Sequence, residues 1–158
     1  MNSLPFIPFF KTSRYRVQTM IDLSEVKPFE RVADLGSGDG RISIEFAKKK
    51  ALVEGFELDP LLADLSEDLI KKSSLEKNII IHRKNFWDED LSRFNIVCIY
   101  PMPDIMQALE AKLQNEIKKG TRILLNYYPF PTWEYEKSKD NVYLYLKKYL
   151  FTEKKLEK

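Results

Sequence analysis

The chain has 158 residues, enough for one domain with a substantial core. Its 26 basic and 24 acidic residues give a net charge of only +2, which makes a nucleic-acid partner unexpected. With one cysteine, Cys98, and one histidine, His82, it cannot form an internal disulfide framework, and neither a metal site nor an oxidising compartment is expected. No apolar run is long enough to span a membrane, so no membrane contact is expected. We also expect a cytoplasmic monomer.

The predicted elements begin with an extended N-terminal arm over residues 1–11, because Pro5 and Pro8 bias their neighbours away from helix. Thr12 or Ser13 is expected to cap a first helix, which Pro28 closes. Apolar runs then predict strands at 31–35, 52–56, 78–82, 94–100, 121–126 and 142–149. Helical patterns cover 40–49, a segment that begins at Pro60 and includes Leu69, and 103–117.

The helix that begins at Pro60 has Asp59 as its expected cap. Its expected buried side consists of Leu62, Leu65 and Leu69. Continuous β-branched runs such as residues 79–81 are typical of strands buried on both faces of a parallel sheet. The alternation of strands and helices therefore predicts an α/β fold with a doubly wound, mostly parallel, Rossmann-like sheet and helices on both faces. We expect a single domain over residues 1–158, with a frayed tail at 151–158.

A glycine-rich loop at residues 34–40 (Asp-Leu-Gly-Ser-Gly-Asp-Gly) joins the first strand of this sheet to the helix that follows. Gly36 and Gly38 allow a tight turn and close approach of a ligand to the backbone, while amides at the helix start can meet an acceptor group. Glu57 stands at the end of the next strand, where a carboxylate can accept both hydroxyls of a ribose. The arrangement predicts a nucleotide-type ligand.

Two such ligands compete, with a purely structural glycine turn as the third interpretation. A dinucleotide loop requires a glycine where this chain has Arg41, which argues against a nicotinamide dehydrogenase. S-adenosylmethionine (SAM) carries no pyrophosphate and suits the shorter G-x-G-x-G spacing. Asp34, two residues before the first glycine, would orient the loop or reach the cofactor's ammonium through water.

The loop resembles motif I of the class I, Rossmann-like SAM-dependent methyltransferases. Further segments resemble one subgroup, which contains small archaeal protein-lysine methyltransferases and the mitochondrial lysine methyltransferases of the ATP synthase c subunit and the adenine nucleotide translocase. These segments are 5–8, 36–42, 55–60, 85–87, 103–106, 109–113, 129–133 and 142–145. The run 100–103 (Tyr-Pro-Met-Pro) departs from the subgroup by an extra proline.

The resemblance implies SAM as cofactor, S-adenosylhomocysteine as product and a protein with an accessible lysine as partner. The residues expected to contact the cofactor are Asp34, Gly36, Ser37, Gly38, Gly40, Glu57, Leu58, Asn85, Phe86 and Tyr100. A lysine must arrive uncharged, and an apolar aromatic channel would lower its pKa by desolvation. The candidate channel residues are Tyr100, Pro101 and Trp133, with Phe6, Pro8 and Phe130 on the substrate side.

Alternatives remain open from sequence. Phe86 and Trp133 are also consistent with ordinary core packing, and Asn85 with a turn cap. The protein could be an RNA or small-molecule N-methyltransferase of the same fold, although residues 100–103 lack the Asn or Asp of the amine-methylase motif that they superficially resemble. It could also be a non-catalytic SAM-binding module.

Overall fold

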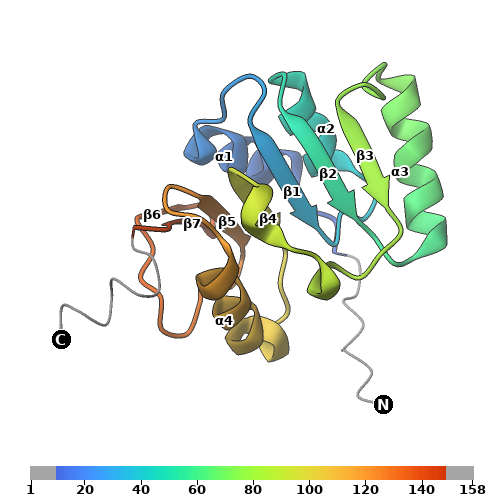
Figure 1. The fold of residues 1–158 in the computed structure, drawn as a ribbon. Coiled ribbons are helices and arrows are strands. Elements are labelled where there is room, and N and C mark those ends of the chain that lie inside the picture. Colours follow the sequence, from blue (N-terminus) through green and yellow to red (C-terminus); the bar gives the residue numbers. More distant parts are fainter. Residues whose placement is uncertain (1–9, 149–158) are drawn as a thin grey trace, which may run out of the picture.

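The computed structural model describes residues 10–148, which form a seven-stranded sheet with helices on both faces (Figure 1). The strands are β1 Arg31–Leu35, β2 Leu52–Phe56, β3 Ile79–His82, β4 Ile96–Ile99, β5 Arg122–Asn126, β6 Lys137–Lys139 and β7 Val142–Leu146. The α-helices are α1 Arg14–Ser24, α2 Arg41–Lys48, α3 Pro60–Lys72 and α4 Met106–Glu116. Short 3-10 turns occupy Phe86–Asp88, Leu91–Arg93 and Pro103–Ile105. The predictions for residues 1–9 of the arm and for the tail at 151–158 lie outside the described residues.

The sheet has the order β3-β2-β1-β4-β5-β7-β6. The first five strands are parallel, and β7 runs antiparallel to both β5 and β6. The chain winds outward from β1 to β3 and then returns to β4 on the other side of β1. This confirms the predicted doubly wound, mostly parallel sheet. In such sheets ligands bind beyond the carboxyl ends of the strands at the point where the winding reverses, which here lies between β1 and β4.

The predicted helix caps are present. The Ser13 hydroxyl accepts a hydrogen bond from the Arg16 amide, and Asp59 accepts one at 2.9 Å from the Leu61 amide with Pro60 as the first helical residue. The short strand β6 was not predicted, because its lysine–serine–lysine sequence is exposed throughout and carries no apolar alternation. It forms by pairing with β7, a tertiary contact that a local pattern does not encode.

Two hydrophobic layers sandwich the sheet, and alternate residues of each strand contribute to opposite layers. Val32 of β1 packs with α1 and α2, whereas Ala33 and Leu35 pack with α4. By the same alternation Asp34 points to the α2 side, although it is charged and only 1% exposed. The end of β1, which leads into the glycine loop, is therefore held between two packed layers.

The buried side of α3 differs from the prediction. Ala63, Ser66 and Ile70 are buried, whereas Leu65 is 46% exposed, and Leu62 and Leu69 are only partly buried, so the predicted leucine face was wrong for Leu65. The reason is close packing against the glycine loop, where a Cβ at Gly40 would lie 3.0 Å from the Ser66 Cβ. Only small side chains fit at this contact.

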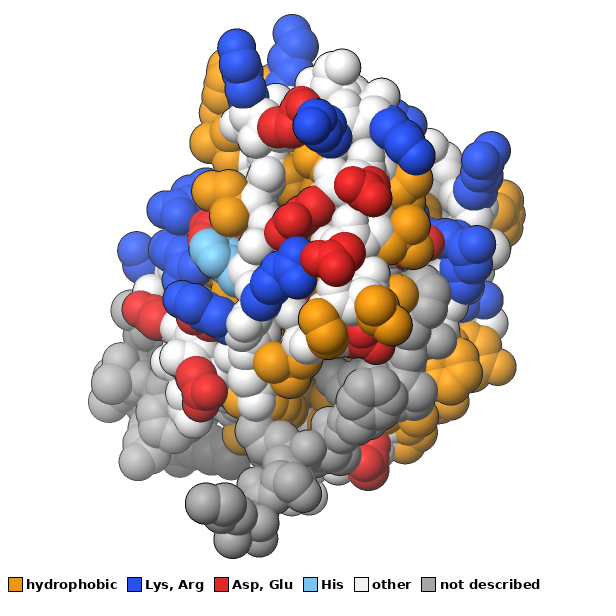
Figure 2. Space-filling view, turned by 90° about the vertical axis from the view of Figure 1, so that its right-hand side faces the viewer, with side chains coloured by type: hydrophobic (Ala, Val, Ile, Leu, Met, Phe, Trp, Pro, Cys, Tyr) orange, Lys and Arg blue, Asp and Glu red, His pale blue; other side chains and the backbone are white. Residues whose placement is uncertain are grey.

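Figure 2, which views the α3 and β3 side of the molecule, shows scattered hydrophobic side chains among charges of both signs.

Candidate cofactor and acceptor site

Three strand ends bring the main predicted site residues together. In the sheet register Leu35 lies opposite Phe56 of β2 on one side and opposite Ile99 of β4 on the other. Gly36, Glu57 and Tyr100 are the next residues of these three strands, so all three leave the sheet side by side at its carboxyl edge. This is the edge and the switch point at which α/β folds bind their ligands.

The glycine loop needs its glycines for conformation. Gly36, Gly38 and Gly40 have φ values of +69°, +57° and +82°, a region that costs other residues steric strain. A Cβ built on Gly36 would meet nothing within 4 Å, so this exposed backbone borders open space. Glu57 accepts hydrogen bonds from the Gly38 amide at 2.7 Å and the Asp59 amide at 2.9 Å. One carboxylate thus fixes both the loop and the start of α3.

These groups fit an adenosyl cofactor. The open space at Gly36 admits a ligand against the backbone, and the two oxygens of Glu57 keep further lone pairs for ribose hydroxyls. The Ser37 hydroxyl is buried and has no hydrogen-bond partner among the described residues, so this loop also contains an unpaired polar group. Gly55 makes room for it, since a Cβ there would lie 2.9 Å from the Ser37 Oγ.

Asp34 lies beneath the loop. Its carboxylate accepts a 2.6 Å hydrogen bond from the Ser43 hydroxyl of α2. Burial raises the pKa of Asp34 to about 6, because the hydrogen bonds from Ser43 only partly offset the loss of hydration and the charges of Glu57 and Asp39 repel the ionised form. This bond joins the end of β1 to α2 on the far side of the loop, and both predicted roles of Asp34 stay predictions.

The raised pKa predicts a specific pH dependence of stability. Because the folded state holds this proton more tightly than the unfolded state, Asp34 contributes most to stability below pH 4, and the contribution is lost as the pH rises to about 6. The loss amounts to about 3 kcal/mol above pH 6. Asp34→Asn should therefore be more stable than wild type at pH 8 but not at pH 4. Melting temperatures across this range, with the exposed Asp64→Asn as control, check this, and parallel curves for Asp34→Asn and wild type would contradict it.

Of the other predicted cofactor contacts, Asn85 and Phe86 serve local structure. The Asn85 side chain accepts a 3.1 Å hydrogen bond from the Trp87 amide, and Phe86 is only 5% exposed in the layer beneath α4. Leu58 is 62% exposed at the loop after β2. The cofactor roles of all three stay predictions.

The turn that contains Phe86 is held by α4. Lys112 donates hydrogen bonds to the carbonyls of Trp87 and Glu89 at 3.1 and 2.8 Å, and forms a 2.5 Å ion pair with Glu116. Glu116 in turn accepts a 3.1 Å hydrogen bond from the amide of Leu91. The Lys112 side chain is only 10% exposed, so these partners replace the hydration that its ammonium group loses on burial.

Tyr100 belongs to an aromatic column at the carboxyl edge of the sheet. Its ring stacks on Phe10 at 5.6 Å and on Tyr127 at 6.3 Å between ring centres, the second pair inclined by only 8°. The Arg16 guanidinium lies 5.5 Å from the centre of the Tyr127 ring. Tyr127 directly follows β5 and has a φ of +80°, which is unusual for a tyrosine. Pro101, beside this column in sequence, is buried.

Phe130 and Trp133 lie in a different aromatic group. They stack on each other at 5.6 Å and both pack edge-to-face on Tyr145 of β7. The Tyr145 hydroxyl accepts a 2.8 Å hydrogen bond from the Phe130 amide, and Glu110 of α4 accepts a 2.7 Å hydrogen bond from the Thr132 hydroxyl. These two substrate-side candidates therefore lie in the layer between α4 and β7, which meets the Tyr100 column only through the contact of Tyr127 with Tyr128 among the described ring pairs. Phe6 and Pro8 lie outside the described residues.

Sequence reasoning missed Phe10, Tyr127, Lys112 and the bonding role of Arg41. Tyr127 had a usable signal, since it directly follows a predicted strand at the carboxyl edge of the sheet. The others had none, because their roles depend on contacts with segments far away in the chain.

Residues 10–148 contain no group of three or more His, Cys, Asp or Glu side chains arranged to hold a metal ion. No helix in this part of the chain is both long and apolar enough to cross a membrane.

Comparison with known proteins identifies the family. The family model of the ANTKMT methyltransferase domain matches residues 34–137. The chain is 32% identical over 131 residues to the adenine nucleotide translocase lysine N-methyltransferase of Mus musculus, covering 81% of this chain and 56% of that protein. It is 30% identical over 137 residues to a protein-lysine N-methyltransferase of Saccharolobus islandicus, covering 84% of both.

Among solved structures, an RNA methyltransferase of Salinibacter ruber in complex with S-adenosyl-L-homocysteine superposes with a TM-score of 0.84 at 26% identity, covering 88% of this chain and 94% of that one. The chain spans little more than half the length of the mouse relative, but most of the archaeal one. The resemblance drawn from the sequence is confirmed: with well over half of its residues matched by the family model, the chain belongs to the ANTKMT methyltransferase domain family.

Proposed function

We propose that this protein is a SAM-dependent N-methyltransferase that acts on lysine side chains of a protein substrate. The observation that carries the proposal is the match to the archaeal protein-lysine N-methyltransferase over 84% of both chains. The convergence of Gly36, Glu57 and Tyr100 at the carboxyl edge of the sheet supports the cofactor half of the proposal. The mammalian relative, also named as a lysine N-methyltransferase, supports the acceptor half.

The residues present would hold and position the reactants rather than exchange protons with them. When bound, SAM would supply an activated methyl group, because S-adenosylhomocysteine is a neutral thioether and a good leaving group. Glu57 would bind the ribose hydroxyls, and the loop amides would approach the cofactor. The aromatic column of Phe10, Tyr100 and Tyr127 would desolvate the incoming lysine, lower its pKa and favour the methylated cation afterwards.

The proposal is tested by incubating the protein with methyl-labelled SAM and a cell lysate. We expect the label to enter a protein band, to be removed by protease and not by nuclease, and to map to lysine by mass spectrometry. A Gly36→Val variant serves as the inactive control, because its side chain would occupy the open space beside the loop. Label found only on arginine, on the amino terminus or in RNA would contradict the lysine assignment.

A second candidate function is RNA methylation. The observation in its favour is the structural match to the Salinibacter ruber RNA methyltransferase, whose chain is almost fully covered. The near-neutral charge of +2 weighs against it, since phosphate backbones are bound mainly by excess Lys and Arg. Label sensitive to nuclease in the same assay would favour this function, whereas calorimetric SAM binding without any transfer would favour a non-catalytic binding module.

We further propose that the enzyme acts as a cytoplasmic monomer. The single cysteine, Cys98, supports this location, because a chain with one cysteine has no internal disulfide of the kind that proteins of oxidising compartments often carry. Cell fractionation and light scattering of the purified protein test the two parts, and a stable dimer or a membrane-bound fraction would contradict them.

A further inference from the structure

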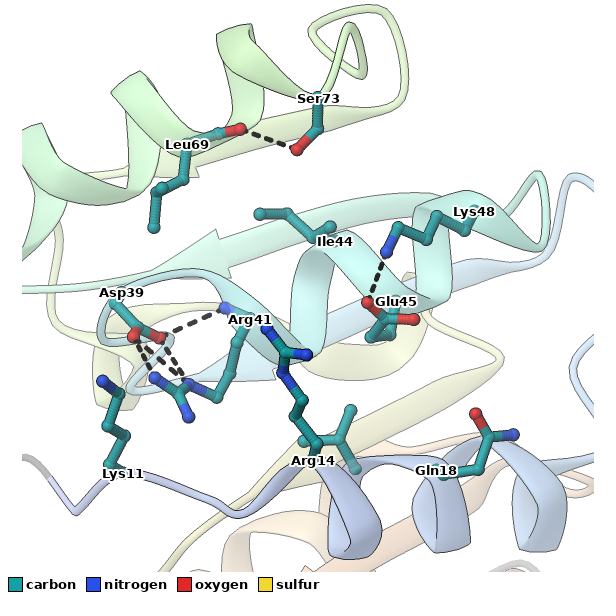
Figure 3. A pocket seen from close by; sticks show the side chains of 11 residues that line it. Lys11, Arg14, Gln18, Asp39, Arg41, Ile44, Glu45, Lys48, Leu69 and Ser73 are labelled. Atoms are coloured by element: carbon teal, nitrogen blue, oxygen red, sulfur yellow. Dashed lines mark hydrogen bonds and ion pairs between the residues drawn. The ribbon is translucent and has the colours of Figure 1, made fainter.

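The guanidinium of Arg41 joins the cofactor loop to the segment that precedes α1. Its Nε and Nη2 donate to the Asp39 carboxylate at 3.0 and 2.6 Å, while Nη1 donates to the Thr12 carbonyl at 2.9 Å. Figure 3 shows the Asp39–Arg41 pair at one end of a cavity of about 560 Å³, with Lys11 beside it. Asp39 is the residue between Gly38 and Gly40, so this bond reaches directly into the loop.

Thr12 is fixed from a second direction by the end of β5. Its hydroxyl accepts a 2.9 Å hydrogen bond from the Asn126 side-chain amide, and Asn126 accepts one at 3.2 Å from Arg16. Thr12 is 3% exposed and Asn126 is fully buried, so the bond between them is shielded from solvent. Thr12 is therefore bonded to the cofactor loop through Arg41 and to the acceptor-side strand β5 through Asn126.

The contacts form a continuous path between the two halves of the site. On the cofactor side, Glu57 accepts a hydrogen bond from the Gly38 amide. The next residue, Asp39, is bonded to Arg41, which also donates to the Thr12 carbonyl. Two residues before Thr12, Phe10 stacks on Tyr100 of the aromatic column. The position of Phe10 is thus tied through Arg41 to the conformation of the loop that would bind the cofactor.

We infer that Arg41 is a positioning residue that makes the placement of residues 10–12 over Tyr100 depend on cofactor binding, so that the acceptor side is completed after the cofactor is bound. The inference rests on the proposed SAM-dependent function. Its physical basis is the planar fork of arginine, which can bond a carboxylate and a carbonyl at once in fixed directions. A lysine at this position would keep the charge opposite Asp39 but would lack this fork.

Hydrogen exchange tests the inference without knowledge of the acceptor. In the wild-type protein, saturating S-adenosylhomocysteine should slow exchange of the backbone amides of residues 11–13 by about tenfold. In Arg41→Lys, with product binding verified by calorimetry, this slowing should fall to less than about twofold. Arg31→Lys is the matched control, because Arg31 pairs with Glu54 at 3.0 Å on β2, and should behave as wild type.

Asp39→Asn provides a second route to the same result, since it keeps Arg41 but weakens its bond to the loop. If Arg41→Lys or Asp39→Asn binds the product and still slows these amides as wild type does, the inference is overturned. The same conclusion follows if the wild-type protein binds the product with no change in residues 11–13. Failure of the wild-type protein to bind the product would instead overturn the proposed function, and the inference with it.

Discussion

Gly36→Val is expected to weaken S-adenosylhomocysteine binding by at least about 100-fold, which corresponds to about 2.7 kcal/mol. Two effects of the substitution need to be separated. At a φ of +69° a β-branched residue costs about 1–2 kcal/mol of stability. In addition, its side chain would project into the open space beside the loop, where the structure has nothing within 4 Å of a Cβ.

Gly120→Val is the matched control for the first effect. Gly120 precedes β5, has a φ of +90° and also has no atom within 4 Å of a built Cβ, but it lies at the opposite edge of the sheet. Both variants should therefore melt at lower temperature than wild type, while only Gly36→Val loses the ligand in calorimetry. Equal loss of binding in the two variants would show that strain alone is responsible and would remove the support for a cofactor at this loop.

Tyr100→Ala is expected to lower the rate of methyl transfer by about 100-fold at saturating SAM, because the lysine would no longer be aligned and desolvated by the aromatic column. Trp133→Leu should keep a rate within about threefold of wild type. It should instead lose about 2 kcal/mol of stability, since Trp133 packs on Phe130 and Tyr145 rather than on Tyr100.

The labelled lysate protein from the transfer assay serves as the acceptor for both variants, and thermal melts report their stability. The pair separates two assignments of the acceptor channel. The sequence favours a channel that includes both Tyr100 and Trp133, whereas the contacts in the structure divide these residues between two aromatic groups. If Trp133→Leu loses transfer while remaining folded, the channel extends to Trp133 and the division is wrong.

Sequence patterns predicted most of the fold because the determining information is local. The β1, β2 and β5 runs, the Asp59–Pro60 helix start and the glycine loop each depend on a few adjacent residues. The register then placed Gly36, Glu57 and Tyr100 together, as expected from the rule that ligands lie at the carboxyl ends of parallel strands.

What sequence patterns could not predict depends on distant partners. Leu65 resembles a core residue by its type and spacing, but the close contact between Ser66 and Gly40 rotates it outward. The contact of Arg41 with Thr12 and the stack of Phe10 on Tyr100 join segments separated by many residues. Trp133 illustrates the same limit, because an aromatic residue in a loop carries no local mark that distinguishes a channel wall from core packing.

Helix α4 has a consequence for protein engineering. Its Glu110 holds the loop after β5 through Thr132, and its Lys112 holds the turn after β3 through two backbone carbonyls. The helix thus braces segments from both halves of the molecule while standing outside the cofactor loop. A chimera that imports the 127–136 loop from a relative must therefore carry a partner for Glu110, or it will bury an uncompensated carboxylate. A graft that also exchanges α4 must preserve Lys112, because this residue bonds the turn after β3. The loop and the helix are therefore best exchanged together.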